Sequence, residues 1–503
     1  MPHTQTQSST PRLIAVSNRV QVETDGENAN RGGLAVALAA ALRQSNGIWF
    51  GWSGEQTEEF TGQIAFRRAD GVATATIDLE AQDIDEYYNG FANRTLWPLF
   101  HYRLDLTEIA RDFAGGYARV NERFADTLSP LIAPDDLIWV HDYHLMPLGS
   151  QLRARGFANR IGFFLHIPWP PPSLLMSLPG HSDLARGMLD YDVIGFQSEE
   201  WRQAFIDYAA VQFEATIDGD ALRLGERCTR LLVCPIGLDI ADFSGAVHSI
   251  AAKQAETRLV ASAVGRDMIV GVDRLDYSKG LQERFAAYER LLADHPELRE
   301  KISLLQIAPP SRGDVASYRQ IRAELDALSG HINGAYASID WVPIRYVNQG
   351  YSRDELFGIY RAARVGLVTP LRDGMNLVAK EYVVAQDPAD PGVLVLSRFA
   401  GAAAQLPEAV LVNPHSIEEI AEGIARALAM PLAERQERHQ AMLATITRHD
   451  VRWWSETFMA ALAEEPGQAP GPAPTADPAS DSAPADSAPA NVARLRDAAS
   501  AQR

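Results

Sequence analysis

Short apolar runs recur along this chain and are separated by longer segments whose apolar residues repeat with helical spacing. In the first half the runs are Leu13 to Val16, Leu137 to Val140, Ile161 to Leu165, Val193 to Phe196 and Leu231 to Val233. Runs this short indicate buried strands, and strands that alternate with helices form a parallel sheet. The sequence therefore predicts an α/β fold.

The same rhythm begins again after a break near Ser244 to Arg266, which we interpret as a linker. The runs of the second half are Met268 to Val272, Ile302 to Ile307, Val365 to Thr369 and Val393 to Ser397. A chain of 503 residues also exceeds what one hydrophobic core usually supports. We expect two α/β domains with a deep cleft between the carboxyl ends of their sheets, where such sheets bind ligands.

The predicted domains span residues 12–245 and 246–445. Residues 446–463 are predicted to form a C-terminal helix that packs back on the fold. The rest of the chain consists mainly of Ala, Pro, Ser, Asp and Gly, a composition that cannot offset its own ordering entropy. We interpret residues 464–503 as a disordered tail.

Composition argues against several classes of protein. A net charge of −19 opposes binding to nucleic acids, because their affinity for proteins comes largely from basic groups. Two cysteines, Cys228 and Cys234, cannot form a disulfide framework, and the N-terminus lacks the features of a signal peptide. No apolar run approaches the roughly 20 residues that span a bilayer. We expect a cytoplasmic protein that binds neither nucleic acids nor membranes.

Polar side chains follow most of the predicted strands, at the position where α/β domains place binding residues. These side chains are Arg19, His141 to His144, His166, Arg274 with Lys279, Arg312, and Arg372 with Asp373. The cations of Arg274 and Lys279 could neutralise a leaving diphosphate without Mg²⁺. The alternative is a solvated loop whose charges pair with Asp273 and Asp276.

Gly32 and Gly33 lie directly before the strongly helical stretch Leu34 to Leu42. Two glycines at the start of a helix leave backbone N–H groups open to an anion, so a phosphate could bind there. A glycine pair before a helix is more often only a turn, and the chain contains neither a G-x-G-x-x-G fingerprint nor a P-loop.

The strand Val365 to Thr369 leads through a loop into a predicted helix, Asn376 to Ala385. Asp373 is a candidate ligand for sugar hydroxyls and Glu381 for ribose hydroxyls, because a carboxylate accepts hydrogen bonds from two neighbouring hydroxyls. The alternatives are a helix cap at Asp373 and an exposed charge at Glu381.

Three further patterns carry less information. The stretch His141 to His144 has metal-binding side chains, but consecutive residues point in different directions, so no metal site is predicted. Asp190 and Asp192 match part of the aspartate pattern of phosphatases, yet they precede their strand instead of following it. The aromatic stretch Tyr87 to Tyr102 could stack on a sugar, although aromatic residues at this density are more often core.

A series of longer motifs occurs in one order between about Leu13 and Phe458. They are Ser17-Asn18-Arg19, Arg31-Gly32-Gly33-Leu34, Asp85-Glu86-Tyr87-Tyr88-Asn89, Leu96-Trp97-Pro98, Trp139 to His144, Phe164 to Pro168, Arg274 to Gly280, Ser311-Arg312-Gly313-Asp314 and Leu371 to Tyr382. In these motifs the chain resembles the trehalose-6-phosphate synthases, retaining glycosyltransferases of the B-type fold with two Rossmann-like domains.

The resemblance implies that UDP-glucose and glucose 6-phosphate react to give α,α-trehalose 6-phosphate and UDP, the first step of trehalose biosynthesis. The positions that match the family's acceptor site are Arg19, Tyr88, Trp97, Asp142 and Arg312. Among these, Arg19 and Arg312 are expected to meet the 6-phosphate.

The resemblance also implies a site for the donor, UDP-glucose. Its matching positions are Gly32, Gly33, His166, Arg274, Lys279, Tyr351, Asp373, Gly374, Met375, Asn376, Leu377, Val378, Ala379, Lys380 and Glu381. Within it, His166 and Asp373 are expected to hold the glucose, and the backbone of Tyr351 the base. The residues expected to act in catalysis are Asp142, His166, Arg274, Lys279 and Asp373.

By the same resemblance we expect no metal or other cofactor, and the leaving phosphate is expected to act as the base. A homo-oligomer, either a dimer or a tetramer, is expected. No phosphatase domain follows the second half in this sequence, so a separate trehalose-phosphate phosphatase is expected to act downstream.

Three other functions remain open from the sequence. A sister enzyme would use glycerol 3-phosphate as acceptor, or ADP- or GDP-glucose as donor. A catalytically silent sugar-phosphate sensor would keep the fold without the reaction. A hydrolase or phosphatase would act on trehalose 6-phosphate alone, through Asp190 and Asp192.

Overall fold

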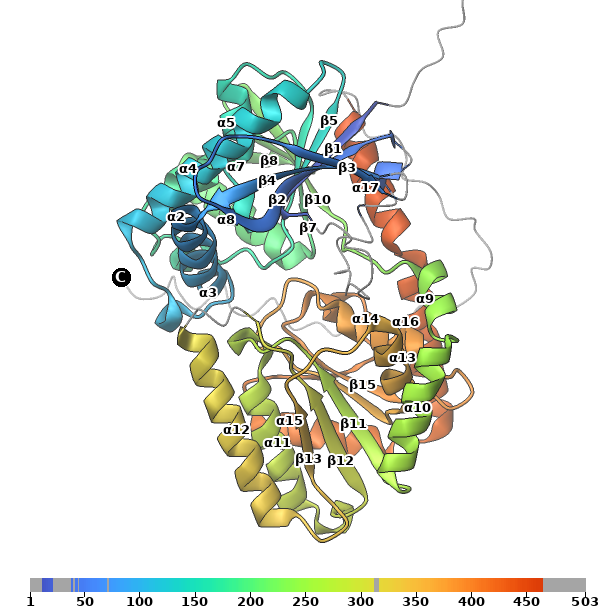
Figure 1. Ribbon diagram of the computed structural model, residues 1–503. Coiled ribbons are helices and arrows are strands. Elements are labelled where there is room, and N and C mark those ends of the chain that lie inside the picture. Colours follow the sequence, from blue (N-terminus) through green and yellow to red (C-terminus); the bar gives the residue numbers. More distant parts are fainter. Residues whose placement is uncertain are drawn as a thin grey trace, which may run out of the picture. The chain divides into compact units, whose positions relative to one another are not determined.

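The computed structural model of the chain describes residues 11–20, 38, 41–43, 45–69, 72–311 and 316–464. The predicted tail therefore lies outside the described residues, except for Glu464. The described residues contain two β-sheets, one in each half of the sequence (Figure 1).

The first sheet contains ten strands. They are β1 (Leu13–Arg19), β2 (Ile48–Thr57), β3 (Ala65–Ala69), β4 (Val72–Glu80), β5 (Leu137–His141), β6 (Ile161–Phe164), β7 (Val193–Phe196), β8 (Thr216–Asp218), β9 (Ala221–Leu224) and β10 (Arg227–Val233). Their spatial order is β3-β4-β2-β1-β5-β6-β7-β10-β9-β8. The strands from β4 to β10 in this order are parallel, and antiparallel pairs lie at both ends.

The second sheet contains six parallel strands. They are β11 (Asp267–Val272), β12 (Ile302–Ile307), β13 (Ile344–Val347), β14 (Val365–Val368), β15 (Val393–Ser397) and β16 (Val410–Val412). Their order is β13-β12-β11-β14-β15-β16, so the chain starts in the middle of the sheet and later crosses to its other side. A reversal of this kind, here between β11 and β14, is where open α/β sheets bind ligands.

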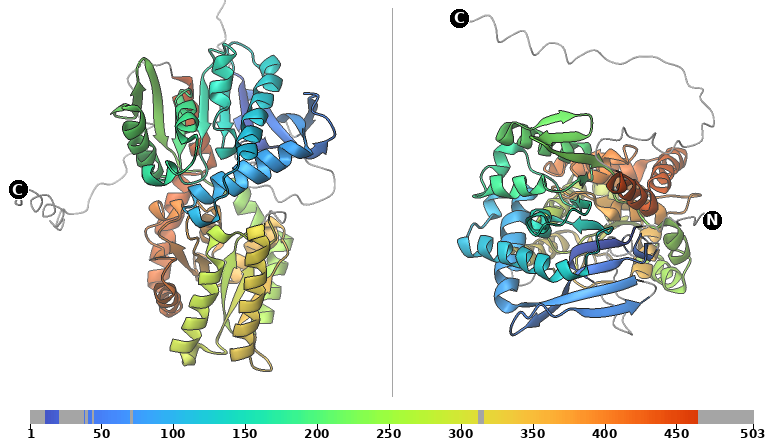
Figure 2. Two further views of the ribbon diagram at one scale, coloured as in Figure 1. Left: turned by 90° about the vertical axis from the view of Figure 1, so that its left-hand side faces the viewer. Right: turned by 90° about the horizontal axis from the view of Figure 1, so that it is seen from above.

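Helices cover both faces of the sheets (Figure 2). Those before the second sheet are α2 (Ala81–Asp83), a wide π-type helix (Ile84–Leu96), α3 (Trp97–Phe100), α4 (Arg111–Leu128), α5 (Leu148–Ala154), α6 (Pro172–Leu175), α7 (His181–Met188), α8 (Glu199–Phe213), α9 (Ile240–Ala246) and α10 (Ile250–Ala263). The later ones are α11 (Leu281–Asp294), α12 (Ala316–Tyr336), α13 (Arg353–Ala362), α14 (Leu377–Ala385), α15 (Ile417–Ala429), α16 (Leu432–Arg448) and α17 (Val451–Ala463). Among the described helices, none combines the length and the apolar character that a bilayer crossing requires.

Successive residues of the inner strands enter different hydrophobic clusters. In β1, Ile14 and Val16 belong to one cluster, whereas Leu13 and Ala15 belong to the other. All four side chains are buried. A strand that is buried on both faces has a continuous apolar sequence, which explains why these strands could be predicted.

The predicted α/β fold with two parallel sheets is confirmed, and every run predicted as a strand coincides with one, although β6 and β14 end one residue before the predicted runs do. The strands that were not predicted are β2, β3, β4, β8, β9, β13 and β16. Most carry polar residues, such as Arg67 and Arg68 in β3, because one face or edge meets water. The chain leaves the first sheet at Val233 and enters the second at Asp267 through α9 and α10. The predicted domain boundaries and the cleft stay predictions.

The helix α17 packs on the first sheet, although it follows the second sheet in sequence (Figure 1). The ring centroids of Trp454 and Phe458 lie 4.8 Å and 4.6 Å from that of Trp139 in β5. Arg160, beside β6, donates through Nε to the carbonyl of Leu462 at 3.0 Å. The end of the described chain thereby covers the core of its first half.

A buried arginine organises the carboxyl edge of the second sheet. Arg284 of α11 has no exposed surface, and its Nη1 donates to Asp273 Oδ2 and to Gln306 Oε1, both at 2.8 Å. Its Nε donates to Thr369 Oγ1 at 3.2 Å. Asp273, Gln306 and Thr369 lie at the ends of β11, β12 and β14. One guanidinium therefore ties three strand ends together.

Replacing Arg284 tests this role. Arg284→Met leaves the Asp273 carboxylate buried without its partner, which should lower the free energy of unfolding by about 3–5 kcal/mol. Arg290→Met is the matched control, since Arg290 lies in the same helix and its pair with Asp294 is half exposed. Urea unfolding followed by circular dichroism measures both variants. Equal unfolding midpoints for the two variants would contradict the role given to Arg284.

Candidate active site

Lys279 and Asp373 form an ion pair, although they are 94 residues apart in sequence. Lys279 Nζ donates to Asp373 Oδ2 at 2.5 Å, and both side chains are largely buried. Burial alone would raise the pKa of Asp373, but the charge and the hydrogen bond of Lys279 outweigh it, so this pKa lies below its ordinary value. The pair thus places an ionised carboxylate beside a cation at the edge of the second sheet.

The loop that contains Asp373 leads directly into α14. Asp373 Oδ2 also accepts from Asn376 Nδ2 at 3.1 Å, and Asn376 Oδ1 accepts from the N–H of Ala379 at 3.3 Å. Asn376 has a φ of 74°, a left-handed conformation that asparagine tolerates better than most residues. Asn376 is therefore the cap of α14, and the alternative that gave this role to Asp373 is wrong.

Gly374 brings the same loop against the first half of the chain. A Cβ atom at Gly374 would lie 2.0 Å from the carbonyl oxygen of His166, which follows β6. A side chain at this position would push the two backbones apart, so the close approach requires glycine. Two of the residues predicted to hold the donor glucose, His166 and Asp373, are thereby brought to one place.

A second contact joins residues predicted for different substrates. The guanidinium carbon of Arg274 lies 4.8 Å from the ring centre of Trp97, at the start of α3. Asp276, which is fully buried, accepts from Trp97 Nε1 at 3.4 Å, and its other oxygen lies 3.6 Å from Arg274 Nη2. Asp276 also accepts from the N–H of Ser278, which fixes the turn that carries Lys279. Lys279 itself pairs with Asp373 rather than with Asp276.

The residues predicted for the acceptor form a row of rings beside a cation. The guanidinium carbon of Arg19, at the end of β1, lies 5.8 Å from the ring centre of Trp52. Trp52 meets Tyr88 edge to face at 5.5 Å, and Tyr88 stacks on His144 at 5.9 Å. Arg19 is exposed, so its charge can reach an anionic ligand. Part of the aromatic stretch thus lines this row, while Tyr87 is core.

Asp142 has an unusual backbone conformation directly after β5. Its φ of 72° and ψ of 166° fall in a region that is essentially restricted to glycine. Its Oδ1 accepts from the N–H of His166 at 3.2 Å. Strain of this kind clusters at functional sites, where it aims a side chain or a backbone group.

The ring of His166 is held on both sides. Its Nε2 lies 3.2 Å from His141 Nδ1, and its Nδ1 lies 3.3 Å from Gln197 Nε2. Burial lowers the pKa of His166 to about 3 and that of His141 well below its ordinary value, so both imidazoles are neutral near pH 7. His166 therefore acts as a hydrogen-bonding group rather than as a cation.

The first turns of α14 carry two buried ionisable side chains. Lys380 Nζ donates to the carbonyl of Ile236 at 2.7 Å, and burial lowers its pKa to about 7. Burial raises the pKa of Glu381 to about 7, although Arg353 and a hydrogen bond from Tyr360 at 3.5 Å oppose this shift. Glu381 is therefore not an exposed surface charge. The half-buried Leu377 and Val378 complete this end of the helix with Ala379 and Met375, which are buried.

Three predicted site residues, Gly32, Gly33 and Arg312, lie outside the described residues. Tyr351 is half-buried just before α13, where its hydroxyl accepts from Gln349 Nε2 at 3.2 Å.

The competing patterns are accounted for elsewhere in the fold. Asp192 pairs with Arg153 at 2.7 Å and with Arg160 at 3.1 Å, and Asp190 pairs with Arg227. Both aspartates precede β7, at the opposite edge of the sheet from His166. Within the described part of the chain, no group of three or more His, Cys, Asp or Glu side chains could hold a metal ion.

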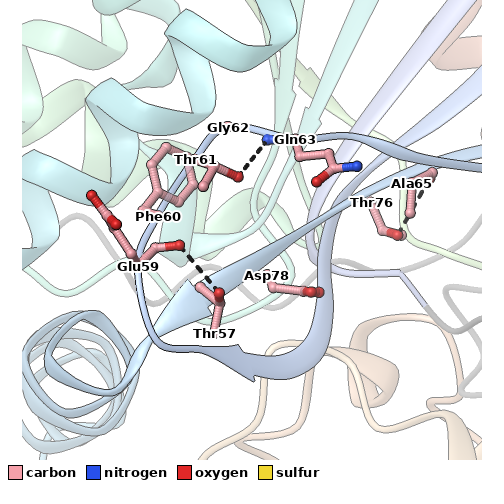
Figure 3. A pocket seen from close by; sticks show the side chains of 9 residues that line it. All are labelled: Thr57, Glu59, Phe60, Thr61, Gly62, Gln63, Ala65, Thr76 and Asp78. Carbon is pink, nitrogen blue, oxygen red and sulfur yellow. Dashed lines mark hydrogen bonds between the residues drawn. The ribbon is translucent and has the colours of Figure 1, made fainter.

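A cavity of about 310 Å³ lies away from these residues, beside the connection between β2 and β3 (Figure 3). Its lining residues are Thr57, Glu59, Phe60, Thr61, Gly62, Gln63, Ala65, Thr76 and Asp78. It contains none of the predicted site residues, so it does not belong to the candidate active site.

Two residues of the site, Trp52 and Gln197, were not predicted from the sequence. Trp52 lies in β2, a strand whose mixed composition gave no signal. Gln197 directly follows the apolar run Val193 to Phe196. The rule that selected Arg19 and His166, a polar residue at the end of a strand, would also have selected Gln197.

Comparison with known proteins gives one consistent result. The sequence pattern of glycosyltransferase family 20 matches residues 10–464. A trehalose-6-phosphate synthase of Enterobacter sp. (strain 638) is 48% identical over 457 residues, which cover 90% of this chain and 95% of that protein.

Two solved structures are similar over nearly their whole length. One is an alpha,alpha-trehalose-phosphate synthase (UDP-forming) from Burkholderia xenovorans in complex with glucose-6-phosphate, with a TM-score of 0.86 and 47% identity over 90% of this chain and 100% of that chain. The other, from E. coli, is bound with UDP-2-fluoro glucose and has a TM-score of 0.86 and 46% identity over 90% of this chain and 98% of that chain. The chain is a glycosyltransferase that belongs to glycosyltransferase family 20, together with the trehalose-6-phosphate synthases.

Proposed function

We propose that this enzyme transfers glucose from UDP-glucose to glucose 6-phosphate and releases trehalose 6-phosphate and UDP. The observation that carries the proposal is the Lys279–Asp373 pair, whose aspartate lies on the loop that touches His166. It combines a cation for a diphosphate with a carboxylate for sugar hydroxyls. The similar structures bound with glucose-6-phosphate and with UDP-2-fluoro glucose support both substrates.

In the proposed reaction, the bond between glucose C1 and the diphosphate oxygen breaks while C1 bonds to the anomeric oxygen of glucose 6-phosphate. The proton of that hydroxyl passes to the leaving diphosphate on the same face of the sugar, so the configuration is retained. Arg274 and Lys279 stabilise the charge that develops on the diphosphate, and Asp373 orients the glucose. Arg19 and Arg312 hold the 6-phosphate of the acceptor.

In the free protein both ring nitrogens of His166 already have partners. A glucose hydroxyl that bonds to this ring would therefore replace His141 at Nε2. Asp142 supports the same place by holding the backbone N–H of His166.

The proposal includes four further points. The reaction needs no metal, because protein cations already face the diphosphate. The enzyme works in the cytoplasm, as a homodimer or a homotetramer. A separate phosphatase then removes the phosphate from trehalose 6-phosphate.

The direct test supplies the purified full chain with glucose 6-phosphate and, separately, with UDP-, ADP- and GDP-glucose in the presence of EDTA. Nucleotide release is measured and the sugar product is identified. Absence of trehalose 6-phosphate with every donor would overturn the proposed function, and loss of activity with EDTA would overturn metal independence. In a parallel reaction with glycerol 3-phosphate in place of glucose 6-phosphate, formation of a glucosylated product would favour the sister enzyme.

Lys279→Met should lower kcat by about 10²–10³-fold, because it removes a preorganised charge that stabilises the leaving diphosphate. Lys301→Met is the control, since Lys301 is exposed beside β12. The rate of UDP release at saturating substrates measures both. If the two variants have the same kcat, the role given to Lys279 is wrong.

Donor affinity should depend on pH through Glu381. The pKa of Glu381 is raised to about 7, so below this pH the carboxyl group is protonated and one of its oxygens no longer accepts a hydrogen bond from a ribose hydroxyl. The affinity for UDP should therefore rise as pH increases through 7. Calorimetric titration with UDP measures the effect in wild type and in Glu381→Gln, which separates it from the titration of UDP itself. An identical pH dependence in both proteins would contradict the role of Glu381.

A further inference from the structure

Two segments of the chain connect the half that contains the first sheet with the half that contains the second, and these segments lie against each other. The first follows β10 and contains Ile236, and the second precedes α17. A Cβ atom at Gly237 would lie 2.3 Å from the carbonyl oxygen of His449, and the N–H of Val451 donates to the carbonyl of Leu238 at 3.0 Å. The backbone at Ile236 is therefore closely confined.

Side chains from both halves bond to Ile236. Its N–H donates to Gln197 Oε1 at 2.9 Å, and Gln197 follows β7 of the first sheet. Its carbonyl accepts from Lys380 Nζ at 2.7 Å, and Lys380 lies in α14, the helix assigned to the donor. Gln197 and Lys380 are only 3% and 1% exposed, so water does not compete effectively for these bonds.

The bond from Ile236 fixes the orientation of the Gln197 amide. A backbone N–H can only donate, so the atom of Gln197 that faces it must be the oxygen. The other end of the amide, which faces His166 Nδ1 at 3.3 Å, is then the NH₂ group, which can only donate. His166 Nδ1 must therefore be an acceptor and cannot carry a proton.

The same logic extends to His141. A neutral His166 that has no proton on Nδ1 carries it on Nε2, which lies 3.2 Å from His141 Nδ1. His141 Nδ1 is then the acceptor, so its own proton is on Nε2. That nitrogen is buried and has no hydrogen-bond partner among the residues that the structure describes. The three hydrogen bonds thus run in one direction: the Ile236 N–H donates to Gln197, Gln197 donates to His166, and His166 donates to His141.

We propose that Gln197 is a positioning residue that holds His166 in the Nε2–H tautomer, and that Lys380 links this arrangement to α14 through the Ile236 peptide. The inference rests on the proposed function, in which His166 faces the glucose of the donor. A movement of α14 relative to the first sheet shifts the Ile236 peptide and the Gln197 amide, and with them the imidazole. The helix that binds the nucleotide thereby sets the orientation of a ring beside the transferred sugar.

The first test reads the tautomer directly. The full chain is labelled with ¹⁵N-histidine, two-bond ¹H–¹⁵N spectra are recorded without substrate, and His166→Gln assigns the signals of His166. We expect a proton on Nε2 in wild type. In Gln197→Glu the carboxylate accepts from Ile236 and can only accept from His166, so the proton should move to Nδ1.

Gln203→Glu is the matched control. Gln203 lies in α8, close to Gln197 in sequence, but its amide bonds to Asp207 at the surface. The signals of His166 in the spectrum of Gln203→Glu should equal those in the spectrum of wild type. A proton on Nδ1 in wild type, or an unchanged tautomer in Gln197→Glu, would overturn the proposal.

The second test measures catalysis. Gln197→Met should lower kcat about tenfold, the usual size of effect when an orienting hydrogen bond is lost, while the KM for glucose 6-phosphate stays unchanged. Lys380→Met should also lower kcat, because it acts through the same Ile236 peptide. The fold-decrease in kcat of the double variant should therefore be smaller than the product of the fold-decreases of the two single variants. Multiplicative effects would overturn the link through Ile236.

The two tests separate this inference from the proposed function. If the wild-type enzyme forms no trehalose 6-phosphate, the proposed function fails, but the tautomer in the free protein still decides the role of Gln197. If Lys380→Met does not fold, Lys380→Leu, which also removes the N–H donor, takes its place in the cycle. A variant that only loosens the structure lowers the melting temperature without moving the proton of His166.

Discussion

The buried guanidinium of Arg284 is the interaction on which the donor side of this enzyme depends. It fixes the ends of β11, β12 and β14 at the point where the strand order reverses, and its Nη2 also reaches the carbonyl of Lys279 at 3.4 Å. The loops that carry Lys279 and Asp373 leave this fixed edge from neighbouring strands. An ion pair between residues far apart in sequence is possible because both loops start from positions that one side chain determines.

Charge is distributed unevenly in this acidic chain. The net charge of −19 repels anions in general, while a few cations, Arg19, Arg274 and Lys279, lie at strand ends. Two of them are held by neutral or anionic partners, since Arg274 lies over Trp97 and Lys279 bonds to Asp373. Such partners keep the cations oriented before a substrate arrives, which reduces the reorganisation that binding requires.

The sequence predicted the parts of the fold that repeat. Strands buried on both faces, such as β1 and β11, are apolar runs, and the polar residues after them include Asp142, His166 and Lys279. The edge strands were not predicted, because one side of each faces water and their sequences therefore include polar residues. The side-chain contacts within the site were not predicted either. A contact such as that of Gln197 with His166 depends on the directions of the side chains, which spacing along the chain does not specify. The resemblance of whole motifs supplied residue roles that physical patterns alone left open.

The packing of α17 has a consequence for how the protein is made. Trp139, in the middle of the first sheet, is covered by Trp454 and Phe458, which follow the whole second sheet in sequence. During translation the first half therefore emerges with an apolar face that stays uncovered until the second half and α17 have also been made. Completion of the first core is thereby coupled to synthesis of the second half.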